Sequence, residues 1–137
     1  MSRFLALGLL LLLAAPALAQ APTPLDGRWK GRSDGGTCNA PLDYDLVIDT
    51  GLVDGSAIDS LAHSPAPNLK KGPAPPPMPG LWQIHGVAKP GTFTLLAVAS
   101  VQATDRRGNR LTVKAEGDTL TITENSGCGR TARLTRG

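Results

Sequence analysis

Two cysteines, Cys38 and Cys128, carry the chemistry that is easiest to anticipate in this chain, and it contains no others. In a domain that leaves the cytoplasm, an even pair is most simply a disulfide. Such a bond would close a loop of 90 residues. On the chain-entropy argument, closing a loop of this length stabilises the folded chain by about 4–5 kcal/mol. A catalytic thiol would need a histidine partner, and no local pattern marks His63 or His85 as one. We therefore predict a Cys38–Cys128 disulfide, with no metal and no cofactor.

The most specific short motif is Asp49-Thr50-Gly51, which follows two apolar residues. It resembles the catalytic loop of aspartic proteases, a resemblance that covers only this short stretch. In that family two such aspartates share one proton, so the resemblance implies a dimer that pairs two copies of Asp49. The same residues suit an ordinary turn, in which Asp49 caps its own backbone and Gly51 takes a positive φ. We expect the turn, and a protein that is not an enzyme.

Three aromatic residues, Trp29, Tyr44 and Trp82, are the candidates for contact with a small ligand. We place Tyr44 and Trp82 near the mouth of the folded domain, beside the proline-rich stretch that precedes Trp82. For Trp29 we favour a packed position at the base of the core, because large aromatic side chains dominate small cores.

Arg106, Arg107 and Arg110 form a basic turn that could bind an anion, although a charged hairpin tip explains them equally well. The whole chain has 14 basic and 11 acidic residues. We expect no nucleic-acid partner, because no aromatic residues are interleaved with the basic ones and the chain carries an export signal.

That export signal lies in residues 1–19. Arg3 gives a positive start, residues 4–15 form an unbroken apolar run, and small side chains stand at Ala17 and Ala19. This arrangement is typical of a secretory signal peptide, and it is too short for a membrane span. We predict cleavage after Ala19, no membrane insertion, and a mature protein in the periplasm or the medium.

Alternation of apolar and polar residues predicts strands through most of residues 20–137. The expected strands lie at 25–32, 43–49, 52–58, 81–87, 91–101, 111–116, 119–123 and 130–136. About eight short strands separated by turns indicate a single all-β domain, a small antiparallel up-and-down barrel, with a sandwich as the second choice.

The cysteines favour the barrel over the sandwich. Cys38 follows the first expected strand and Cys128 precedes the last. With an even number of up-and-down strands, the first and last are antiparallel, which brings these cysteines together with their Cα atoms within about 6 Å. Closure would also remove the exposed edges of an open sheet.

Residues 63–80 interrupt the strand pattern with many prolines. Such a segment cannot form the interior of a helix or a strand, and it is too long for an ordinary hairpin loop. We expect an extended excursion between the third and fourth strands, with a polyproline recognition segment as the alternative.

The pattern Gly27-Arg28-Trp29-Lys30-Gly31, then Cys38, then Gly51-Leu52-Val53-Asp54-Gly55, is similar to one found in small exported bacterial β-proteins of unknown function. Calycin-like barrels, including avidin-type ones, and Inh-type inhibitors of the cell envelope also open with a Gly-x-Trp strand. What the resemblance implies is limited to the fold and the compartment.

These observations predict a monomeric, exported binding protein whose partner is a small molecule or an envelope protein. Ligand binding in the barrel would require a pocket of at least about 300 Å³. The alternative is an inhibitor of an envelope protease or lysozyme, which would present to the enzyme's cleft either a loop or residues 20–25, a free, proline-containing tail. A dimeric aspartic protease built on Asp49 is the third possibility.

Overall fold

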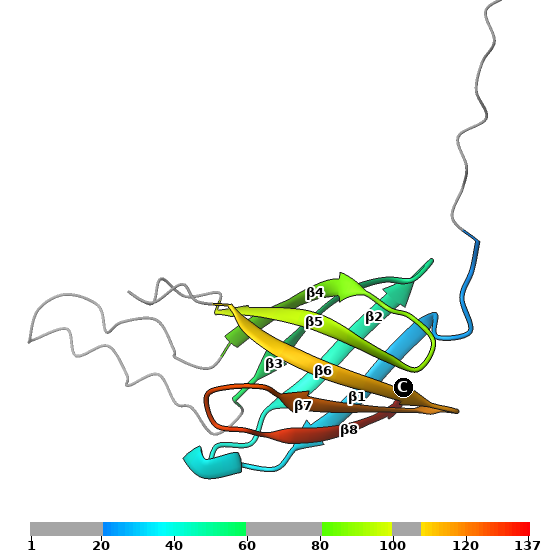
Figure 1. The fold of residues 1–137 in the computed structure, drawn as a ribbon. Coiled ribbons are helices and arrows are strands. Elements are labelled where there is room, and N and C mark those ends of the chain that lie inside the picture. The colour runs from blue at the N-terminus through cyan, green and yellow to red at the C-terminus, as the bar shows by residue number, and fades with distance from the viewer. Residues whose placement is uncertain (1–20, 60–80, 100–107) are drawn as a thin grey trace, which may run out of the picture.

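The structure, a computed structural model, describes residues 21–59, 81–99 and 108–137. Its strands pair in sequence order and the first also pairs with the last, which closes an antiparallel barrel (Figure 1). The predicted up-and-down barrel is therefore confirmed, and the sandwich is not. The proline-rich residues 63–80, together with Arg106 and Arg107, lie outside the described residues.

The elements follow the sequence pattern closely. The strands are β1 (Gly27–Ser33), β2 (Asp43–Asp49), β3 (Leu52–Ile58), β4 (Leu81–Val87), β5 (Thr92–Ala99), β6 (Asn109–Glu116), β7 (Thr119–Glu124) and β8 (Thr131–Arg136). A short 3-10 helix, η1 (Gly36–Cys38), lies between β1 and β2. Within the described ranges no helix is long and apolar enough to cross a membrane.

Each strand directs alternate side chains into the barrel, as the period-two pattern requires. In β2 the three apolar residues at even positions are buried, while the aspartates between them face outward. Asp43 and Asp45 pair with the basic outer face of β1. Arg28 donates to Asp45 through both Nε and Nη2, and Arg32 Nη1 lies 2.9 Å from Asp43. Asp43 and Asp45 of β2 are therefore partners of β1 on the outer wall.

Side chains fill the barrel interior. An eight-stranded barrel is just wide enough inside for side chains to pack against one another. The residues with no exposed surface are Trp29, Leu46, Ile84, Val113, Ile122 and Leu134. Burying each side chain of this size contributes roughly 1.5–3 kcal/mol, so this core is the main source of stability.

Two inward-facing glycines allow the wall to bend tightly. A Cβ at Gly31 would collide with the backbone of Arg133 on β8, and one at Gly55 would collide with the backbone of Asp45 on β2. Only glycine permits these close approaches between neighbouring strands. Gly31, the second glycine of the Gly-x-Trp-x-Gly motif, is thus required by the close approach of β1 to β8.

The up-and-down topology gives the barrel two distinct ends (Figure 1). We call one end the N-terminal mouth, formed by residues 21–26 and the turns at 50–51, 88–91 and 117–118. The other is the disulfide mouth, formed in its described part by the loops at 34–42 and 125–130.

Candidate ligand-binding site

The disulfide mouth is held by the predicted bond between Cys38 and Cys128, whose Cα atoms lie 5.3 Å apart. The Thr37 amide donates to the Cys128 carbonyl at 2.8 Å. Gly36 sits so close to the same carbonyl that it has no room for a Cβ, and its φ is +55°. Helix η1 and the β7–β8 loop are therefore packed tightly together, and the role of the cysteines is structural.

A buried ion pair lies beside the disulfide, and the sequence patterns had not singled it out. Arg130 Nη1 lies 2.8 Å from Glu124 Oε1, with side chains only 9% and 4% exposed. Arg130 Nε also donates to the Ala40 carbonyl at 2.6 Å. This side chain thus ties the β7–β8 loop to the β1–β2 loop. Glu124 is the next residue in the alternating series of inward-facing positions of β7, after Leu120 and Ile122. This alternation is the sequence signal that could have predicted its burial.

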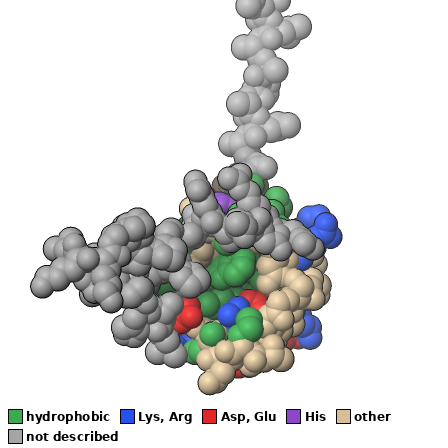
Figure 2. Space-filling view, turned by 90° about the vertical axis from the view of Figure 1, so that its left-hand side faces the viewer, with side chains coloured by type: hydrophobic (Ala, Val, Ile, Leu, Met, Phe, Trp, Pro, Cys, Tyr) green, Lys and Arg blue, Asp and Glu red, His purple; other side chains and the backbone are tan. Residues whose placement is uncertain are grey.

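Tyr44 and Trp82 share a row of inward positions near this mouth, separated by Ala57 on β3. Tyr44 is buried, and Trp82 is partly buried against the core. Burial, reinforced by the nearby Glu124 carboxylate, raises the pKa of the Tyr44 phenol, so its hydroxyl stays protonated. Seen from this end, hydrophobic side chains gather in the middle, beside basic and acidic ones (Figure 2).

Trp29 lies nearer the opposite mouth and is fully buried. Its register partner on β2 is Leu46, one inward position beyond Tyr44. The indole Nε1 donates to the Leu25 carbonyl at 2.8 Å, and the Arg136 guanidinium covers the ring. Trp29 is therefore a core plug, and the structure does not group it with Tyr44 and Trp82.

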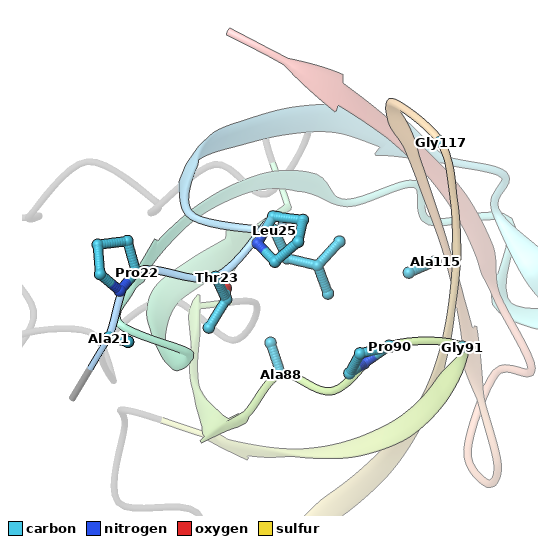
Figure 3. Close-up of a pocket in the computed structure, with 10 residues that line it drawn as sticks. Ala21, Pro22, Thr23, Leu25, Ala88, Pro90, Gly91, Ala115 and Gly117 are labelled. Atoms are coloured by element: carbon cyan, nitrogen blue, oxygen red, sulfur yellow. The ribbon is translucent and has the colours of Figure 1, made fainter.

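The N-terminal mouth contains a pocket of about 560 Å³ (Figure 3). Residues 21–25 form one wall, the β4–β5 turn with Ala88, Pro90 and Gly91 forms the second, and Ala115 with Gly117 forms the third. None of these described lining residues is charged. The pocket therefore offers shape and apolar surface rather than an ion-pairing group.

Several backbone polar groups of the lining already have partners within the protein. Three contacts illustrate this: Leu25 O accepts from Trp29 Nε1, Ala88 N donates to Gly51 O at 2.7 Å, and Ala115 N donates to Gly91 O at 2.8 Å. An apolar occupant would leave these hydrogen bonds intact, which avoids the cost of stranding buried polar groups.

Neither protein-family models nor curated proteins nor solved structures give a match to this chain. The geometry of the two mouths is thus the basis for a functional assignment.

The N-terminal segment differs from the free tail expected at 20–25. From Thr23 onward it is bound to the barrel through Asp26. The Asp26 carboxylate accepts from Thr23 N at 2.9 Å and from Thr23 Oγ1 at 2.6 Å, and it also accepts from the amides of Thr50 and Gly51 in the β2–β3 turn. Leu25 is buried. Of the expected tail, Ala21, Pro22 and Pro24 are exposed, and Gln20 lies outside the described residues.

The Asp49-Thr50-Gly51 motif forms the β2–β3 turn, but Asp49 does not cap it. Thr50 and Gly51 have φ values of +49° and +82° and complete a two-residue hairpin loop of the primed type. Their amides both donate to Asp26, each at 3.0 Å. Asp49 is exposed on the outer face of β2. The carboxylate that accepts these bonds belongs to Asp26, in the segment just before β1. The start of β1 pairs with the end of β2, which brings Asp26 to this turn.

The remaining candidate residues lie on the outside of the barrel. Arg110 belongs to β6 and faces outward, rather than sitting at a turn. His85 Nδ1 lies 3.1 Å from Asp54 on the outer wall. In the described part of the chain, no three His, Cys, Asp or Glu side chains group as metal ligands would.

Sequence reasoning missed the pocket residues because alanine, proline and glycine carry no chemical signal. The one available signal was topological. In an up-and-down barrel the even-numbered turns and the N-terminal segment share one end, and the turns at 88–91 and 117–118 bring small residues there.

Proposed function

We propose that this protein is an exported binding protein that holds the apolar part of a small molecule in the N-terminal mouth. The observation that carries the proposal is the uncharged pocket of about 560 Å³. This volume falls within the roughly 300–1,000 Å³ of small-molecule sites. An alkyl or aryl group is the occupant that fits, since each Å² of apolar surface removed from water contributes about 25 cal/mol.

Export to the periplasm or the medium is part of the proposal. The apolar leader in residues 1–19 supports it, as does the Cys38–Cys128 disulfide, because such bonds persist in oxidising compartments. The protein acts as a monomer, in keeping with a closed barrel that offers no free strand edge for pairing.

Titration with the uncharged fluorophore N-phenyl-1-naphthylamine tests the proposal directly. The purified mature chain should enhance the dye's fluorescence saturably, and 1-decanol should displace the dye. Ala115→Leu places a larger side chain in the pocket. We expect this variant to bind the dye at least about tenfold more weakly, a loss of about 1.4 kcal/mol.

Ala99→Leu is the matched control. Ala99 is also a half-buried alanine at an inward position, but it pairs with Trp82 near the disulfide mouth. This variant should bind the dye as the wild type does. No saturable binding, or equal losses in both variants, would contradict the proposal.

A further inference from the structure

The wall formed by residues 21–25, which we call the strap, is fastened by a residue outside the pocket lining. The Asp26 carboxylate accepts two hydrogen bonds from Thr23 in the strap and two from the turn amides of Thr50 and Gly51. Bonds to an ionised acceptor are stronger than those between neutral groups. Asp26 therefore links one pocket wall to the β2–β3 turn.

A second anchor holds only the C-terminal half of the strap. Arg136 Nη1 donates to the Asp26 carbonyl at 2.7 Å, and Nη2 donates to the Pro24 carbonyl at 2.5 Å. The indole of Trp29 adds its bond to Leu25. Residues 21–23 lie beyond these anchors. In the described part of the chain, the hydrogen bonds that fasten this half of the wall join Thr23 to Asp26: two to the carboxylate, and one from the Asp26 amide to the Thr23 carbonyl at 3.1 Å.

The turn to which Asp26 is bonded has an unfavourable conformation. Thr50 is β-branched, yet its φ of +49° lies in the left-handed region that such side chains rarely adopt. Its amide and that of Gly51 are held there by Asp26. Loss of the carboxylate contacts would therefore loosen both the turn and the N-terminal half of the strap. The Asp26 amide bond to the Thr23 carbonyl and the Ala88 amide bond to the Gly51 carbonyl would remain.

We propose that Asp26 is a positioning residue whose contacts with Thr23 latch the strap over the pocket, so that ligand binding and latching favour each other. The inference depends on the proposed function, because the latch acts on the same pocket. Reciprocity requires that an occupied pocket strengthen the latch and that a weakened latch lower the affinity.

The test compares dye binding in two carboxamide variants. Asp26→Asn should weaken binding of N-phenyl-1-naphthylamine about tenfold. The control is Asp49→Asn, which replaces an exposed carboxylate beside the same turn and should leave the dye affinity within about twofold of the wild-type value. Thr23→Val serves if Asp26→Asn fails to fold. It keeps the shape and adds apolar surface to the lining, so weaker binding would report the lost hydroxyl bond.

Amide hydrogen exchange supplies a readout that a purely structural role would not change. The Thr50 and Gly51 amides bond to Asp26, but Thr50 and Gly51 are not among the described residues that line the pocket. We expect 1-decanol to slow exchange at both amides in the wild type and not in Asp26→Asn.

The outcomes separate the two proposals. Wild-type binding with no loss in Asp26→Asn or Thr23→Val, or with no ligand-dependent protection of the Thr50 amide, overturns the latch and leaves the pocket. Absence of wild-type binding overturns both.

Discussion

The guanidinium carbon of Arg136 lies 4.5 Å from the centre of the Trp29 ring. The two residues are register partners across the β8–β1 seam that closes the barrel. The same guanidinium donates to Pro24 and Asp26 carbonyls and pairs with Asp118 through Nε at 3.1 Å. One side chain thus covers the largest buried residue and joins the last strand to the strap.

Replacing Arg136 with methionine should destabilise the protein by about 1–2 kcal/mol. The variant keeps an apolar stem over Trp29 but loses the cation–π contact and the charged donors to the Pro24 and Asp26 carbonyls. Urea unfolding followed by Trp fluorescence measures the change. Arg133→Met, on the outer face of the same strand, should stay within about 0.5 kcal/mol of the wild type. Equal losses in the two variants would refute the role given to Arg136.

Thr50→Asn should stabilise the protein by about 1 kcal/mol. Asparagine tolerates a positive φ, and Asn-Gly is the preferred pair in this type of hairpin turn, whereas Thr50 bears the cost of a left-handed conformation. The expected result is a rise in melting temperature of roughly 4–8 °C. Thr92→Asn, at the start of β5 and without a positive φ, should give no rise. A fall for Thr50→Asn would contradict the interpretation.

Local patterns predicted most of the fold because they act over short distances. Alternation within β2 assigned its buried face, and the positions of Cys38 and Cys128 relative to the first and last strands predicted closure. Both inferences need only the parity of a strand and the direction of an up-and-down chain.

The site depends on contacts that neighbouring residues in the sequence do not reveal. The turn at Thr50 and Gly51 is capped by Asp26 rather than Asp49, because β1 pairs with β2 and brings the strap to that turn. The pocket likewise arises where three chain segments meet. Its residue types alone are equally typical of ordinary loops.

Breaking the disulfide should lower the melting temperature by roughly 10 °C or more. The bond joins residues 90 positions apart, which corresponds to about 4–5 kcal/mol in the chain-entropy description. The Cys38→Ser/Cys128→Ser double variant and the reduced wild type should show the same loss by calorimetry. Free thiols in the protein recovered from outside the cytoplasm would contradict the assignment.

Stability should fall in acid partly through Asp26 and Asp45. The Thr23 hydroxyl bond lowers the pKa of Asp26, and the bond from Arg28 lowers the pKa of Asp45, from ordinary values of 3.8. Because the unfolded chain then binds protons more readily, this stability is present above pH 3.8 and is lost as the pH falls through the lower folded values.

Unfolding free energies at about pH 6, about pH 4 and about pH 2.5 measure this dependence. Asp26→Asn should flatten the decline, since its carboxamide does not titrate. If the free energy of unfolding of Asp26→Asn fell with pH as steeply as that of the wild type, Asp26 would not contribute to the acid dependence of stability.

The most direct test of the central claim is residue-resolved NMR of residues 20–137 during titration with 1-decanol. Binding in the N-terminal mouth predicts saturable shifts at the amides of Ala88, Gly91 and Ala115, which line the pocket. The amide signals of Tyr44 and Trp82, near the disulfide mouth, should not shift. Shifts confined to Tyr44 and Trp82, or no saturable shift at the three pocket amides, would contradict the account.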